Sequence, residues 1–221
     1  MALPASYEEI ATLLDEQAFE KSSIEKLQAY LDEQIATETY DFVANKALLK
    51  LYSFYPDQAS DQYIALALTK ALMALPSTDM MLLLYLVPES AQTKEPVATL
   101  VRCAVHLETA KFVEFWEVAN LGGNELLDAV SGFDEAIRSY MIGVLSITFQ
   151  KVESETFADL LALDEGDLEE YVSANQSDKL SIEGKNVVFT PNSENQQRPK
   201  KFKENISFDQ MLPLIDFLAS S

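Results

Sequence analysis

No glycine occurs in the first 121 residues of this 221-residue chain. Glycine adopts left-handed backbone conformations without steric cost, so the tight turns of β-sheets commonly use it. A stretch this long without glycine therefore favours helices. Apolar residues in it recur at helical spacing, and one such run places Leu27, Leu31 and Ile35 on a single face. The sequence predicts a succession of helices over this region.

These helices are predicted to be short and joined by brief loops. One is expected to begin near Asp41 and to end before Pro56, because the residue before a proline disfavours the helical region. Short helices in this order favour stacked antiparallel pairs of the HEAT or tetratricopeptide kind over residues 1–130. No strict consensus repeat is present, so a compact helical bundle remains the alternative.

Residues 131–221 carry a different pattern, which is typical of a winged helix with a small β-hairpin. An amphipathic helix is followed by two short helical segments, two alternating runs and a last apolar segment, which are, in order, Phe133–Thr148, Thr156–Leu163, Asp164–Val172, Lys179–Glu183, Asn186–Thr190 and Ile206–Leu218. Pro213 lies in the last segment and predicts a short or kinked helix there. The predicted fold class is mainly α, with helical repeats followed by this winged-helix domain.

Acidic residues dominate the predicted winged helix. Between Lys151 and Lys179 there are nine acidic residues and no basic one, and the whole chain has a net charge of −20. Nucleic acids are bound through Lys and Arg side chains that neutralise phosphates, so this pattern argues against DNA or RNA and favours protein partners. The candidate protein-interaction surface is formed by Asp164, Glu165, Asp167, Glu169 and Glu170. The alternative is that the acidity serves solubility alone.

One basic cluster stands against this background: Arg198, Lys200, Lys201 and Lys203, with an aromatic residue among them. It is a candidate contact for RNA or for an acidic protein surface, and the alternative is a solvated loop. A function of another class, a winged-helix nucleic-acid-binding protein, would use this cluster as its basic wing.

Enzyme chemistry has little support in the sequence. His106 is the only histidine and Cys103 the only cysteine, and their spacing places them on one helix face. Two such residues, with Glu108 as a third at best, fall short of the four ligands of a structural zinc site. The expectation is therefore no catalytic residue, no cofactor and no metal. Trp116 is expected to anchor either the core or an interface.

The expected location is the cytoplasm. A single cysteine excludes an intramolecular disulfide and suits a reducing compartment. No apolar run approaches the ~18 residues of a membrane span, and the first residues lack the basic start and apolar core of a signal peptide.

Several blocks of residues resemble a known family. They are Tyr40–Tyr52 with Pro56, Lys70–Leu72, Leu75-Pro76, Thr78-Asp79, Phe112 with Phe115-Trp116, Gly132-Phe133 and Ser207–Asp209. On these blocks, and on the order of a helical half and a winged helix, the chain resembles the PCI-domain proteins. These are scaffold subunits of the proteasome lid, the COP9 signalosome and eukaryotic translation initiation factor 3. Within that group it most closely resembles the subunit K family of initiation factor 3.

The resemblance implies a non-catalytic structural subunit that acts in translation initiation through protein–protein contacts. It implies partners among the other initiation factor 3 subunits, subunit L above all, and contact with the small ribosomal subunit through the complex. It carries no catalytic residues. The alternative within the group is the smallest PCI-type subunit of the COP9 signalosome or of the proteasome lid.

Overall fold

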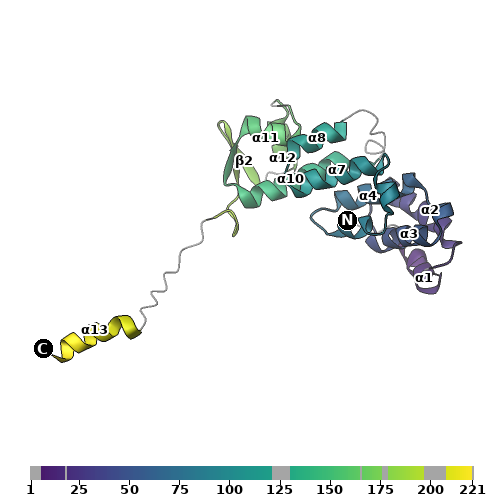
Figure 1. Cartoon of the computed structure of the whole chain (residues 1–221). Helices are drawn as coiled ribbons and strands as arrows, with labels where there is room; N and C mark the ends of the chain where they lie inside the picture. The colour runs from purple at the N-terminus through teal and green to yellow at the C-terminus, as the bar shows by residue number, and fades with distance from the viewer. Residues whose placement is uncertain are drawn as a thin grey trace.

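The computed structural model describes residues 6–17, 19–120, 130–164, 166–175, 179–196 and 208–220. The chain is mainly helical, with one small three-stranded antiparallel sheet. In Figure 1 the helices up to α8 lie beside the group formed by α10–α12 and the sheet, and helix α13 lies apart at the C-terminal end.

The N-terminal part is built from short helices, as the missing glycines predict. They are α1 (Tyr7–Gln17), α2 (Ser23–Ala36), α3 (Phe42–Phe54), the 3₁₀ turn η1 (Pro56–Gln58), α4 (Asp61–Met73), α5 (Asp79–Leu84), α6 (Glu89–Gln92), α7 (Val97–Glu108) and α8 (Phe112–Asn120). Sequential neighbours such as α1 and α2, α2 and α3, and α7 and α8 pack against each other.

Helix α3 begins and ends where the sequence predicts. The Asp41 carboxylate accepts hydrogen bonds from the backbone N–H groups of Val43 (2.9 Å) and Ala44 (3.2 Å). These are two of the N–H groups that a helix start leaves without a partner. The helix ends at Phe54, two residues before Pro56.

A buried polar network ties α3 to its neighbours. The Gln34 side-chain amide donates to Asn45 Oδ1 (2.9 Å), and its carbonyl accepts from the Asp41 N–H (2.8 Å). The Tyr30 hydroxyl donates to the Asp41 carboxylate (3.1 Å), and the fully buried Lys70 donates from Nζ to the backbone carbonyl of Gln34 (3.3 Å). Burial lowers the pKa of Lys70. The network fixes α2, α3 and α4 to one another through directional bonds.

The segment from 130 to 196, called the C-terminal module below, combines helices and the sheet. Its elements are α10 (Phe133–Thr148), β1 (Lys151–Glu153), α11 (Ser154–Leu161), α12 (Leu168–Asn175), β2 (Leu180–Glu183) and β3 (Asn186–Phe189). The strand order is β1-β3-β2, and Val187 of β3 pairs with Val152 on one side and Ile182 on the other. The amphipathic helix and the hairpin are thus confirmed.

Two details of this module differ from the sequence-based expectation. Strand β1 has only three residues and was not predicted, because a pattern of period two needs a longer run to be visible. Helix α12 begins at Leu168 and not at Asp164. Asp164 and Asp167 lie in the turn before it, where the Asp167 N–H donates to the Asp164 carbonyl (3.0 Å).

Both parts share one hydrophobic core. Buried apolar side chains form a single cluster that runs from Ile10 to Phe189. Trp116 of α8 donates its indole N–H to the Leu160 carbonyl of α11 (3.1 Å), and Arg138 of α10 donates from Nε to the neighbouring Leu161 carbonyl (3.0 Å). Packing therefore continues from the helical part into the C-terminal module.

Helix α13 (Phe208–Ala219) is a continuous helix that contains Pro213. The sequence predicts a short or kinked helix here, and the structure has a helix of 12 residues. Pro213 removes one backbone hydrogen-bond donor but does not end the helix. Several of its apolar side chains are exposed, namely those of Met211, Leu212, Leu214, Ile215 and Leu218.

A candidate interaction pocket in the C-terminal module

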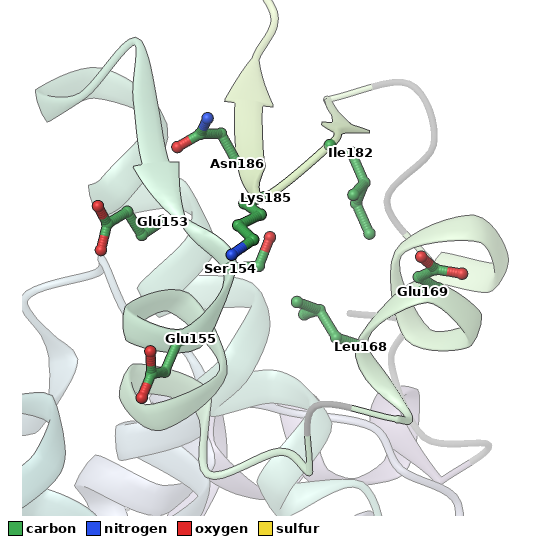
Figure 2. Close-up of a pocket in the computed structure, with 9 residues that line it drawn as sticks. Glu153, Ser154, Glu155, Leu168, Glu169, Ile182, Lys185 and Asn186 are labelled. Atoms are coloured by element: carbon green, nitrogen blue, oxygen red, sulfur yellow. The ribbon is translucent and has the colours of Figure 1, made fainter.

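A pocket of about 670 Å³ opens in the C-terminal module. It lies between the start of α11, the start of α12 and the turn that joins β2 to β3 (Figure 2). Its lining consists of Glu153, Ser154, Glu155, Leu168, Glu169, Ile182, Gly184, Lys185 and Asn186.

Local backbone structure sets the shape of this pocket. The chain passes from β1 directly into α11, so Glu153 ends the strand and Ser154 begins the helix. The Ser154 N–H donates to the Lys185 carbonyl (2.9 Å) and fastens the helix start to the hairpin turn. Gly184 precedes Lys185 in this turn with φ +64°, a left-handed conformation that suits glycine. The tight turn therefore brings Lys185 to the start of α11.

Two apolar side chains form part of the pocket wall, and the charged groups of the lining are exposed. Leu168 is buried and Ile182 is partly buried, and in Figure 2 both side chains point into the space between the helices and the turn. The lining includes three carboxylates, with Glu153 and Glu155 on one side of this space and Glu169 on the other (Figure 2). Among the described residues of the lining, Lys185 is the one basic residue. Within the described ranges these four charged side chains form no ion pair with one another or with other residues.

The hydroxyl of Ser154 is the unusual polar group here. Its Oγ is shielded from solvent and has no hydrogen-bond partner in the described part of the chain. Buried hydroxyls normally have a hydrogen-bond partner, since one without a partner lowers the free energy of unfolding by about 1–3 kcal/mol. A donor or acceptor that entered the pocket could supply it.

The predicted acidic surface coincides with this pocket only in part. Glu169 lines the pocket, whereas Asp164, Asp167 and Glu170 are exposed but do not belong to the lining. Glu165 lies outside the described residues. Glu153 and Glu155 were missed by the prediction, because they line the same pocket as Glu169 only through the packing of β1 and the start of α11 on the β2–β3 hairpin.

The basic cluster of Arg198, Lys200, Lys201 and Lys203 falls entirely outside the described residues. Its role as an RNA contact, an acidic-partner contact or a solvated loop therefore stays a prediction.

Cys103 and His106 occupy different environments on α7. Cys103 is fully buried, and burial raises the pKa of its thiol to about 11. His106 is partly buried, and its Nδ1 has no hydrogen-bond partner in the described part of the chain. A thiol becomes a nucleophile as its thiolate, which a lowered pKa favours. The environment of Cys103 therefore opposes catalysis by this residue.

We expect Cys103 to be protected from a thiol reagent near pH 8. Relative to the ordinary pKa of 9.0, a rise to about 11 leaves about 100-fold fewer thiolates, and burial also blocks access. Absorbance with dithionitrobenzoate should show labelling at least about 100-fold slower in the folded chain than in guanidinium chloride. Cys103→Ser gives the background, and equal rates in both states would contradict the buried placement.

Two further observations concern metal binding and membrane-spanning helices. Across the described ranges, no group of three His, Cys, Asp or Glu side chains comes together in a way that could hold a metal ion. In the part of the chain that the structure describes, every helix is too short or too polar to cross a lipid bilayer.

Comparison with known proteins gives consistent matches along the chain. Residues 58–201 match the model of the CSN8/PSMD8/EIF3K family. The chain is 35% identical to eukaryotic translation initiation factor 3 subunit K of Dictyostelium discoideum over 84% of its length and 73% of that protein. It is 31% identical to the subunit K proteins of Xenopus laevis, over 87% of both chains, and of Bombyx mori, over 91% of both chains.

Proposed function

The chain belongs to the CSN8/PSMD8/EIF3K family, and on this premise we propose that it is a non-catalytic structural subunit of eukaryotic translation initiation factor 3. The observation that carries this proposal is the similarity over most of the chain to relatives that bear the name of subunit K. Because the relatives described above carry one of the three names in the family description, they favour this branch over the other two.

The architecture that accompanies this function has two parts. We propose that residues 1–130 form a helical-repeat domain of the HEAT or tetratricopeptide kind and that residues 131–221 form a winged-helix domain with its C-terminal helix. The succession of short packed helices α1–α8 supports the first assignment. The order of α10, α11 and α12 before the β2–β3 hairpin, with β1 completing the sheet, supports the second.

We propose further that the chain acts in the cytoplasm through protein contacts, with subunit L as a direct neighbour and with the small ribosomal subunit as a partner of the whole complex. Resemblance to the PCI-domain family supports these partners. Direct nucleic-acid binding has no part in this proposal, because the chain carries a net charge of −20 and the C-terminal module exposes carboxylates.

Helix α13 supports an assembly role by its exposed apolar side chains. Leu214 and Leu218 are 64% and 69% exposed and stand one helical turn apart. An isolated helix of 12 residues is only marginally stable in water, and packing of its apolar face supplies most of the stability of such helices. We therefore propose that α13 packs against helices of neighbouring subunits.

This proposal predicts that two charges on α13 disrupt assembly. In cells that express a tagged chain, Leu214→Glu with Leu218→Glu should reduce recovery of the other initiation factor 3 subunits by about tenfold or more, because a carboxylate is costly to bury in an apolar contact. The readout is quantitative mass spectrometry of the purified material.

A matched variant controls for the added charge. Thr12→Glu with Ser90→Glu adds the same two charges at exposed positions of α1 and α6, and recovery should remain at the level of the unmodified chain. Equal recovery with the α13 variant and with the control would rule out α13 as a docking helix.

A further inference from the structure

We propose that the pocket between α11, α12 and the β2–β3 turn binds an arginine or lysine side chain that a partner protein presents on an extended segment. The inference goes beyond the subunit assignment, because it names a site and the chemistry of its occupant.

The charge of the pocket selects a cationic occupant. Glu153, Glu155 and Glu169 outnumber Lys185 three to one, and the surrounding chain is strongly acidic. Glu155 and Glu169 lie in the first turns of α11 and α12. In the described part of the chain no cation pairs with these carboxylates, so they are available to a basic group from outside.

The walls of the pocket suit a long basic side chain. Leu168 and Ile182 offer apolar surface to its methylene stem, and the lining also carries carboxylates on both sides of this space, those of Glu153 and Glu155 on one side and that of Glu169 on the other. A volume of about 670 Å³ exceeds what a single side chain fills and leaves room for adjacent backbone. An extended segment therefore fits better than an isolated ion.

Ser154 gives an independent indication of a ligand. Its Oγ is shielded from solvent and has no partner in the described residues, although it belongs to the pocket lining. A guanidinium or ammonium group carries only donors, and a hydroxyl oxygen can accept from either. An entering basic head would thus satisfy this oxygen.

Lys185 allows an experiment to distinguish a cationic ligand from an anionic one. Its side chain lies on the exposed hairpin turn with its nitrogen beside Ser154 in Figure 2. A cationic ligand is repelled by this ammonium, whereas an anionic ligand would depend on it for attraction. Replacing Lys185 with methionine therefore strengthens binding in the first case and weakens it in the second.

The experiment titrates the full ¹⁵N-labelled chain with two blocked hexapeptides, Gly-Gly-Leu-Arg-Gly-Gly and its twin with glutamate in place of arginine. We expect saturable amide shifts at Ser154, Glu155 and Glu169 with the arginine peptide alone. Lys185→Met should tighten its binding about three- to fivefold, and the triple change of Glu153, Glu155 and Glu169 to Gln should weaken it about tenfold or more.

A charge-matched variant distinguishes binding at the pocket from attraction of the peptide by the net negative charge of the whole protein. Glu8, Glu25 and Glu114 are exposed in the helical part. Changing all three to Gln alters the net charge by the same amount as the triple change in the pocket. This variant should bind the arginine peptide within about twofold of the unmodified chain.

Several results would overturn the proposal. They are no saturable shift with the arginine peptide, equal weakening by both triple variants, binding of the glutamate peptide instead, or weaker binding after Lys185→Met. Each concerns the pocket of the isolated chain and leaves membership of initiation factor 3 untouched, since that is read out by co-purification.

Discussion

Replacing Trp116 with alanine should lower the free energy of unfolding by about 3–5 kcal/mol, the largest single-residue effect that we expect. The indole is 6% exposed and packs edge-to-face on Phe115 with ring centroids 4.9 Å apart. Its N–H donates to the Leu160 carbonyl, and the Arg138 guanidinium lies 5.2 Å from the ring centre. The change therefore removes core packing, a hydrogen bond and a cation–π contact at the junction of α8, α10 and α11.

Urea unfolding followed by circular dichroism measures this effect, because Trp116 is the only tryptophan and its fluorescence is lost with it. Trp116→Phe is the matched control. It keeps an aromatic ring but removes the indole donor, so it should cost about 1–3 kcal/mol. An unchanged unfolding midpoint for Trp116→Ala, together with weaker partner binding, would place this residue at an interface instead of in the core.

Asp41→Ala should lower the free energy of unfolding by about 2–4 kcal/mol. The carboxylate caps α3 through the N–H groups of Val43 and Ala44, and loss of such a cap costs about 0.5–2 kcal/mol. The same carboxylate accepts from Tyr30, which is only 2% exposed, so its hydroxyl would lose a buried acceptor at a further cost of about 1–3 kcal/mol.

Asp41→Asn is the control for this prediction, because its amide oxygen can still accept at the start of α3. It should cost less than about 1.5 kcal/mol. Equal losses for the alanine and asparagine variants in urea unfolding would mean that the carboxylate acts through its charge and not through the cap geometry.

Those parts of the fold that depend on local chemistry could be predicted from the sequence. Helix α3 begins at an Asp that caps it and ends before a proline, and both signals lie within the helix or next to it. The β2–β3 hairpin likewise carries its turn signal, Gly184, between two alternating runs.

Features that depend on partners distant in the sequence could not be predicted from it. Strand β1 is three residues long and is defined by its pairing with β3, more than thirty residues later. Gln34, Asn45 and Lys70 are polar residues that a helical pattern would assign to the surface, yet they are buried because each finds a partner on another helix.

The same reason explains why the pocket was predicted only in part. Glu169 belongs to an acidic run that is visible in the sequence, whereas Glu153 and Glu155 lie fourteen or more residues before it. These three residues line one pocket because β1 leads directly into α11 and the hairpin turn packs on the start of that helix. A sequence pattern does not predict this packing of residues that are distant in the chain, and the unpartnered Ser154 hydroxyl has no sequence signal of its own.

Affinity purification of the tagged chain from cells, with quantitative mass spectrometry of what it retains, tests the subunit assignment most directly. We expect the other initiation factor 3 subunits, subunit L among them, to be recovered in fixed proportion to the chain. Recovery of proteasome-lid or signalosome subunits without initiation factor 3 subunits would contradict it.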